Sequence, residues 1–146
     1  TGFHVRRLSL DLPERYPIDK PQRAAAAIGA LKAMGASVVL DDFGSGYTSI
    51  AYLKKYGFSA IKIDRSLSSR IGVDDKARVL VTGVVYLANG LDMPVTAEGV
   101  ETDEQARLLR LAGCQNLQGY RYYRPKPIEE LLACEFLQPE AAAAVS

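Results

Sequence analysis

The stretch Ser37-Val-Val-Leu-Asp-Asp-Phe-Gly44 carries the pattern that decides the fold of this chain. Its β-favouring part ends in two carboxylates and a glycine, and a helical pattern lies on each side of it. The same alternation recurs along the chain. The expected strands are Val5–Leu12, Ser37–Leu40, Ala60–Ile63, Pro94–Ala97 and Cys114–Leu117, and the expected helices are Pro21–Met34, Thr48–Tyr56, Asp74–Asn89, Thr102–Ala112 and Ile128–Phe136.

Five consecutive βα units with short links predict an α/β fold with parallel strands and right-handed crossovers. Periodicity alone leaves two architectures open: a doubly wound sheet, such as a receiver-like domain with its first strand in the centre, and part of a (β/α)₈ barrel. A complete barrel needs about 250 residues, so on the second interpretation these 146 residues are its last five units. A half barrel would leave strand edges and an apolar sheet face unpaired, which favours association.

The composition is that of a globular domain, with 48% apolar residues, 24% charged residues and a net charge of +1. There is no basic run that would follow DNA, and no apolar stretch long enough to enter a bilayer. Cys114 and Cys134 have neither metal-knuckle nor CxxC spacing, so two reduced thiols and a cytoplasmic location are expected. We expect one domain over residues 1–137 and a flexible tail over residues 138–146.

Ionisable or amide side chains follow every expected strand. In a parallel α/β protein, the carboxyl ends of the strands meet on one face, where sites are built. Carboxylates without cysteine ligands suit hard cations such as Mg²⁺ or Mn²⁺, and the adjacent pair Asp41 and Asp42 suits a two-metal centre acting on phosphate. Lys62 would orient a metal-bound water or neutralise a phosphate oxygen. The strand-end residues are Glu14, Asp41, Asp42, Lys62, Glu98, Glu101 and Gln118.

Each of these residues also has a purely structural interpretation. An acidic pair before a glycine-rich turn commonly caps backbone N–H groups, and a glutamate before a helix favours the helix dipole. Lys62, between two isoleucines, can face solvent. What favours a site is that all of them fall at the same relative place in consecutive units. His4, the single histidine, is interpreted as incidental.

Linked motifs make the chain resemble the EAL domain family. Asp41–Ser49 resembles the family's DDFG(T/S)GYSS loop, and Lys62-Ile63-Asp64 resembles its KID strand end. Ala97-Glu98-Gly99-Val100-Glu101-Thr102 is similar to AEGVET, and Gln118-Gly119-Tyr120 with Arg124-Pro125 is similar to the QGY…RP close of the barrel. The order and spacing agree, and the likeness covers nearly the whole chain except its tail.

The resemblance implies a partial TIM-like barrel that hydrolyses cyclic di-GMP to linear pGpG by a water activated by two Mg²⁺ or Mn²⁺ ions. It implies cyclic di-GMP and a second copy of the domain as partners, with sensory or GGDEF domains in a longer parent that other segments could anchor to a membrane. The implied metal ligands are Glu14, Asp41 (bridging), Asp42 and Glu98. For Glu98 the resemblance implies either the role of a ligand or that of the general base. The implied remaining roles are Lys62 holding the water, Glu101 and Gln118 in support, and Phe43, Gly44, Ser45, Gly46 and Tyr47 coupling the site to dimer formation.

Two departures from the family pattern bear on activity. Asp11-Leu12-Pro13-Glu14 lies where the family has E(I/L)TE, and Pro13 removes a backbone donor beside Glu14. The chain contains no Glu-Ala-Leu tripeptide, whose glutamate is a metal ligand in the family, nor the strand with a further asparagine ligand. Two functions remain open: a phosphodiesterase when the missing half of the barrel is supplied, and an inactive EAL domain that binds cyclic di-GMP or a protein partner.

Overall fold

The computed structural model describes residues 4–15, 18, 20–45 and 50–133. After the 3₁₀ turn η1 (Val5–Arg7), strands and helices alternate in the order that the sequence pattern predicts. The strands are β1 (Ser9–Pro13), β2 (Ser37–Phe43), β3 (Ala60–Ile63), β4 (Val95–Ala97) and β5 (Asn116–Leu117). The helices are α1 (Pro21–Ala33), α2 (Ile50–Tyr56), α3 (Arg65–Ser68), α4 (Asp75–Asn89), α5 (Asp103–Leu111) and α6 (Ile128–Leu132).

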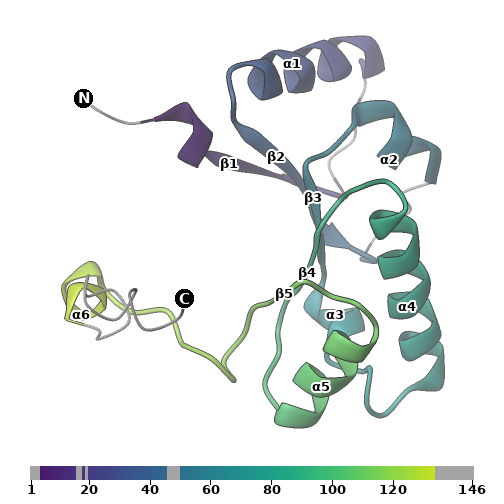
Figure 1. The fold of residues 1–146 in the computed structure, drawn as a ribbon, viewed down its shortest axis with the longest axis vertical. Helices are drawn as coiled ribbons and strands as arrows, with labels where there is room; N and C mark the ends of the chain where they lie inside the picture. Colours follow the sequence, from purple (N-terminus) through teal and green to yellow (C-terminus); the bar gives the residue numbers. More distant parts are fainter. Residues whose placement is uncertain (1–3, 16–17, 19, 46–49, 134–146) are drawn as a thin grey trace.

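The strand order identifies the architecture. The five strands form one parallel sheet in the order β1-β2-β3-β4-β5, so each strand pairs with its successor in the chain. A doubly wound sheet would reverse direction at a switch point and place β1 inside the sheet. The doubly wound and receiver-like interpretations are therefore wrong, and the partial TIM-like barrel is confirmed. Figure 1 shows α1, α2 and α4 along the upper and right-hand side of the sheet, with η1 and α6 on the left.

The hydrophobic core lies between the sheet and its helices. Alternate residues of the central strands point toward the helices and are almost completely buried, as the two-residue period of a strand requires. They pack against the inner faces of α4 and α5. The residues at the centre of this layer are Leu40, Ile61, Ile63, Val95, Ala97, Val81, Val85 and Leu109.

The other face of the sheet corrects one expectation. We expected an apolar uncovered face, but the alternating positions there are mixed: Val39 and Ala60 are apolar, whereas Lys62 lies in register with Thr96, and Thr96 with Asn116. Asp11 of β1 is on the same face. The uncovered face of the half barrel is therefore apolar only in part, at Val39 and Ala60, and is otherwise lined by polar residues.

Several element boundaries differ from the expected ones. Val5–Arg7 is a 3₁₀ turn, because β2 begins at Ser37 opposite Ser9 and so offers these three residues no strand to pair with. β2 continues past Leu40 to Phe43 through an irregularity in its pairing with β3. Short helix α3 was not expected; the Asp64 carboxylate caps it by accepting a hydrogen bond from Ser66 N at 2.9 Å.

The longer helices follow the sequence closely. The helices predicted over Pro21–Met34, Asp74–Asn89 and Thr102–Ala112 are confirmed to within one residue at each end, and Thr102 caps α5. Thr48, Ser49, Cys134 and the tail over residues 138–146 lie outside the described residues. None of the described helices combines the length and the hydropathy needed to cross a membrane.

The buried face of β3 yields a stability prediction. Ile61 is 0% exposed, so Ile61→Ala leaves a cavity in the central layer and should lower the free energy of unfolding by about 2–5 kcal/mol in urea titrations. Val79→Ala, at a position 69% exposed on α4, is the control and should change it by less than about 0.5 kcal/mol. Equal effects of the two substitutions would contradict the placement of the core.

Candidate active site

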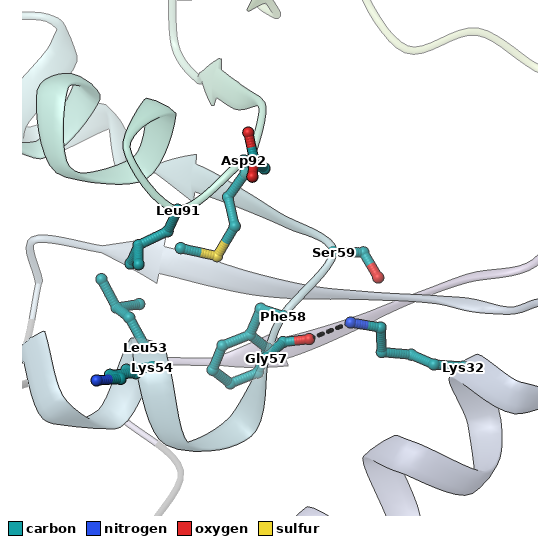
Figure 2. A pocket seen from close by; sticks show the side chains of 9 residues that line it. Lys32, Leu53, Lys54, Gly57, Phe58, Ser59, Leu91 and Asp92 are labelled. Carbon is teal, nitrogen blue, oxygen red and sulfur yellow. Dashed lines mark hydrogen bonds between the residues drawn. The ribbon is translucent and has the colours of Figure 1, made fainter.

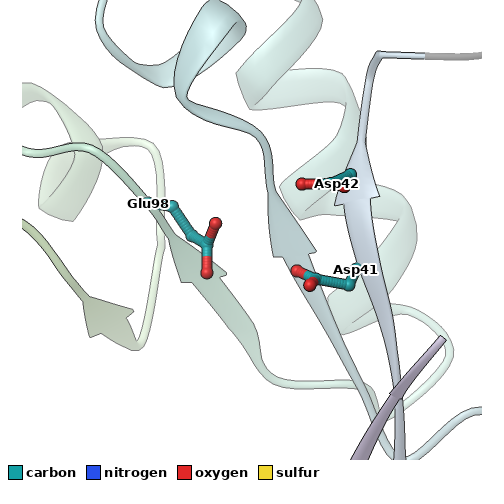
Figure 3. Close-up of side chains that lie close together, drawn as sticks. All are labelled: Asp41, Asp42 and Glu98. Atoms are coloured by element: carbon teal, nitrogen blue, oxygen red, sulfur yellow. The ribbon is translucent and has the colours of Figure 1, made fainter. Parts of the chain in front are cut away.

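Three carboxylates meet at the carboxyl end of the sheet. Asp41 and Asp42 lie in β2 just before its last residue, Phe43, and Glu98 directly follows β4. One oxygen of each carboxylate lies within 4.8 Å of the others (Figure 3). Neighbouring residues of a regular strand point to opposite faces. Here the register shifts between Leu40 and Phe43, and Asp42 takes a left-handed conformation with φ of 57°. This bulge allows both aspartates to face Glu98.

Lys62 lies among the acidic side chains. Its Nζ is 2.7 Å from Asp11 Oδ2, 3.4 Å from Glu98 Oε1 and 3.8 Å from Asp41 Oδ1. One ammonium group thus contacts carboxylates from β1, from β2 and from the end of β4. The sequence analysis did not predict a role for Asp11. It could have been found as the first acidic residue of the segment Asp11–Glu14, because the two-residue period of a strand places it on the same face of the sheet as Lys62.

Glu14 lies apart from this group. Its side chain is buried, its Oε2 accepts a hydrogen bond from Gly44 N at 3.0 Å, and its own N–H donates to Asp41 O at 2.8 Å. Glu14 therefore ties the end of β1 to the start of the loop that follows β2. In that loop Ser45 Oγ accepts from Arg15 Nε at 3.2 Å, while Gly46 and Tyr47 lie outside the described residues.

Glu101 and Gln118 lie beside Glu98 without joining the three-carboxylate group. Glu101 pairs with Arg65 NH2 at 2.8 Å. Gln118 hydrogen-bonds through its N–H to Ala97 O and lines, with Glu98 and Tyr120, a hollow of about 200 Å³. His4 is exposed before η1, and the ion pairs of Lys62 and the three-carboxylate group of the described residues do not include it.

The charges of the site affect one another. Burial, followed by repulsion from Asp41, raises the pKa of both Asp42 and Glu98 above the ordinary range. Burial opposes the charge on Lys62, but its hydrogen bond to Asp11 and the field of Asp41 together raise its pKa. Asp42 and Glu98 are thus held where the ionised form of a carboxylate is disfavoured, beside a lysine that stays charged.

The site has the chemistry of a cation site. Asp41 Oδ1 is buried and accepts no hydrogen bond from the described residues, which is costly for a carboxylate oxygen. A cluster of carboxylate oxygens suits hard divalent cations such as Mg²⁺, Mn²⁺ or Ca²⁺. The residues present therefore fit a divalent cation.

A family model described as "EAL domain" matches residues 1–125. The chain belongs to the EAL domain family. An uncharacterized signaling protein of Caulobacter vibrioides is 41% identical over 131 residues, which are 90% of this chain and 16% of that protein. The bifunctional diguanylate cyclase/cyclic di-GMP phosphodiesterase MucR of Pseudomonas aeruginosa is 37% identical over 126 residues, which are 86% of this chain and 18% of MucR.

Solved EAL structures have the same fold. The PaMucR phosphodiesterase in complex with c-di-GMP superposes with a TM-score of 0.82 at 36% identity, over 88% of this chain and 52% of that chain. Klebsiella pneumoniae BlrP1 in a manganese/cy-diGMP complex gives a TM-score of 0.79 at 29% identity, over 85% of this chain and 32% of that chain. The chain thus spans only part of the proteins that it matches.

A second hollow of this EAL domain, of about 320 Å³, lies at the other end of the strands (Figure 2). Its lining includes Phe58 and Ser59 before β3 and Met93 before β4, and Lys32 Nζ donates to Gly57 O across one side. Among the described residues that line it, Asp92 is the one with a carboxylate. The hollow therefore lacks the acidic character of the site around Glu98.

Burial and like-charge repulsion at Asp42 together predict a stabilising substitution. Asp42→Asn should raise the free energy of unfolding of the metal-free protein at neutral pH, because it removes a carboxylate whose ionised form the fold disfavours. Asp92→Asn is the matched control, since Asp92 has the same φ of 57° and lies at the other end of the strands.

In urea titrations with EDTA at pH 7, we expect Asp42→Asn to raise the free energy of unfolding by roughly 0.5 kcal/mol more than Asp92→Asn does. Since the pKa of Asp42 is raised in the folded state, the excess should disappear as the pH falls below the ordinary aspartate pKa. An excess that persists in acid would show that backbone conformation, not charge, is responsible.

Proposed function

We propose that this chain supplies the acidic side of an EAL active site that hydrolyses cyclic di-GMP to linear pGpG with the help of divalent cations. The observation that carries the proposal is the meeting of Asp41, Asp42 and Glu98 with Lys62 at the carboxyl end of the sheet. The names of two similar proteins support the substrate, since MucR is named a cyclic di-GMP phosphodiesterase and BlrP1 was solved with manganese and the dinucleotide.

The cation site would be formed by Asp41, Asp42 and Glu98. Asp11 would hold the ammonium group of Lys62 beside this site. Two Mg²⁺ or Mn²⁺ ions, when bound, would neutralise the phosphate and make a water molecule more acidic. The sequence pattern also predicted Glu14 as a ligand. Because its carboxylate accepts from Gly44 N, we propose instead that Glu14 anchors the loop after β2.

Lys62 and Glu98 would handle the proton and the charge. Lys62 keeps its ammonium group charged and can donate hydrogen bonds to the attacking water or to a phosphate oxygen. Glu98, with its raised pKa, can accept a proton from that water. Hydrolysis would form one P–O bond to the water oxygen and break the P–O bond to the ribose oxygen. The ribose oxygen would take up a proton from solvent, and the release to solvent of the proton held by Glu98 would restore the starting state. Glu101 and Gln118 would support Glu98 from the neighbouring hollow.

The partners of this EAL domain are part of the proposal. The matched relatives are several times longer than the chain, so further domains of the GGDEF or sensory kind are proposed for the parent. We propose a homodimer whose formation is coupled to the site through the loop Phe43–Tyr47. The hydrogen bond from Gly44 N to Glu14 supports this coupling, because it joins the loop to the strand ends that carry the carboxylates.

Asp41→Asn tests the cation site. In the complete domain we expect cyclic di-GMP turnover with Mn²⁺ to fall about 100-fold or more, because the substitution removes a charged oxygen at the centre of the site. Asp75→Asn, at a side chain 87% exposed on α4, is the control and should leave turnover unchanged. A complete domain that binds the dinucleotide but never cleaves it would be an inactive receptor instead.

The need for the remaining strands of the barrel gives a second test. We expect the 146-residue chain alone to release no pGpG, whereas the same chain joined to the Glu-Ala-Leu and asparagine strands should be active with Mn²⁺. Product is measured by chromatography at equal protein concentrations. Robust turnover by the chain alone would contradict the proposed contribution of the other half of the site.

A further inference from the structure

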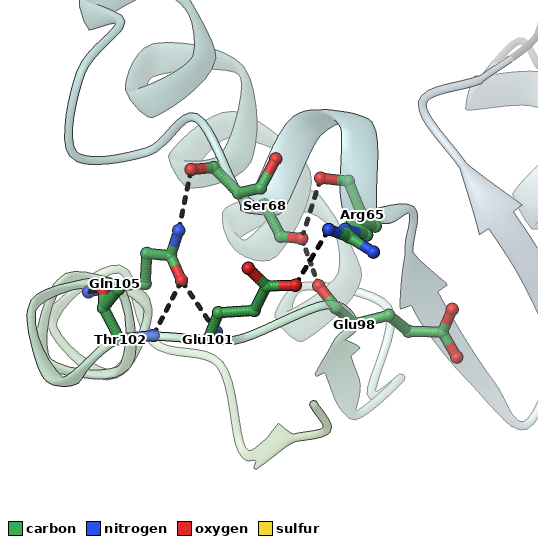
Figure 4. A network of polar contacts seen from close by, with 7 residues as sticks. Arg65, Ser68, Glu98, Glu101, Thr102 and Gln105 are labelled. Atoms are coloured by element: carbon green, nitrogen blue, oxygen red, sulfur yellow. Dashed lines mark hydrogen bonds and ion pairs between the residues drawn. The ribbon is translucent and has the colours of Figure 1, made fainter. Parts of the chain in front are cut away.

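Short helix α3 makes contacts that hold the end of β3, which carries Lys62, against the segment that begins at Glu98 after β4. It begins directly after Lys62-Ile63-Asp64, and the Asp64 carboxylate caps its first turn. Its other neighbour is the segment from Glu98 to Thr102, which joins β4 to α5 (Figure 4). Polar contacts join α3 to that segment at three points.

The first contact holds the main chain of Glu98. Ser68 is 1% exposed, and its hydroxyl donates to the carbonyl oxygen of Glu98. On its other side, the Glu98 N–H donates to Ile63 O at 3.0 Å. The N–H of Glu98 is thereby held by the last residue of β3, and its carbonyl oxygen is held by α3. Both elements lie within a few residues of Lys62 in the chain.

The second contact is made by Gln105, in the first turn of α5. Its Nε2 donates to Ser69 O at 3.0 Å, and its Oε1 accepts from Glu101 N at 2.8 Å and from Thr102 N at 3.0 Å (Figure 4). One amide side chain therefore joins the end of α3 to the two N–H groups that close the segment after Glu98.

At the third contact, the segment after β4 lies so close to α3 that there is no room for a side chain at Gly99. Arg65 NH2 pairs with Glu101 at 2.8 Å. A Cβ atom at Gly99 would lie 2.2 Å from Arg65 Cγ, and Gly99 has φ of +69°, which favours glycine. The segment between β4 and α5 is thus packed directly on α3, with little room to shift.

We propose that Gln105, acting with Ser68, is a positioning residue that holds Glu98 at the correct distance from Lys62 and Asp41. This inference rests on the proposed function, because it assumes that Glu98 belongs to the cation site. The Gln105 side chain contacts none of the three carboxylates; its contacts are with main-chain atoms of Ser69, Glu101 and Thr102. Its effect must therefore pass through the main chain of the segment that begins at Glu98.

Gln105→Glu separates positioning from helix capping. A glutamate at this place keeps the oxygen that accepts from Glu101 N and Thr102 N, which is the usual partner in a capping box. It loses the donor to Ser69 O and places a carboxylate against that carbonyl. We expect Mn²⁺ affinity of the complete domain, measured by calorimetry well below the unfolding temperature, to fall about 10-fold or more. The unfolding temperature of the metal-free domain should stay close to that of the wild type.

Two further variants complete the experiment. Gln22→Glu makes the same chemical change in the first turn of α1, at an exposed position, and should leave Mn²⁺ affinity unchanged. Ser68→Ala removes the other contact and should also weaken Mn²⁺ binding. If both residues act on the same segment, the double variant should lose less than the product of the two separate losses.

The outcomes distinguish this inference from the proposed function. Wild-type domain that binds no Mn²⁺ would overturn the cation site itself. Wild-type binding with unchanged affinity in Gln105→Glu would overturn the positioning role alone. Loss of affinity that matches a loss of folded protein in the same sample would likewise overturn it, because the residue would then be merely structural.

Discussion

The arrangement of this EAL domain depends on one ammonium group among carboxylates. Lys62, Asp41 and Glu98 have side chains that are 21%, 20% and 21% exposed, so water screens them only in part. Two like charges about 4 Å apart repel by about 4 kcal/mol at the effective dielectric of a protein surface, which is a large share of a domain's stability. Lys62 offsets this repulsion because it contacts carboxylates from three directions. Burial, followed by the remaining repulsion from Asp41, raises the pKa values of Asp42 and Glu98.

Such a cluster forms only where the backbone is firmly held. Two departures from regular backbone aim the carboxylates: the bulge with Asp42 at positive φ, and Gly99 at positive φ after β4. Strain and like charges of this kind persist at functional sites when the surrounding structure over-determines them. Here the surrounding structure is the apolar layer under β2, β3 and β4, where Leu40, Ile61 and Ile63 are 0% exposed. The site and the core are thus opposite faces of the same three strands.

The sequence predicts much of this arrangement, and its failures have physical reasons. The alternation of patterns located all five strands, and the rule that parallel strands end on one face brought Asp41, Lys62 and Glu98 together in advance. Strand order needed the structure, because periodicity does not encode which strands are neighbours. The side chain of Asp11 pairs with Lys62, whereas that of Glu14 accepts a hydrogen bond from Gly44 N. Which of the two acidic residues reaches Lys62 depends on the pleat of β1 and on the residue at which the strand ends. The α3 contacts could not be foreseen, since Ser68 and Gln105 bond to main-chain atoms 30 and 36 residues away.

The distribution of apolar residues explains how part of a barrel can have a core of its own. In this chain the apolar layer lies between the sheet and its helices, whereas Asp11, Lys62, Thr96 and Asn116 share the other face. Strands that complete the barrel would therefore find apolar surface on that face mainly at Val39 and Ala60. Their main attachment would be to the main-chain N–H and C=O groups along the outer edges of β1 and β5, each of which pairs with one strand among the described residues. Closure of the barrel would then place further side chains opposite the carboxylates without disturbing the layer that holds them.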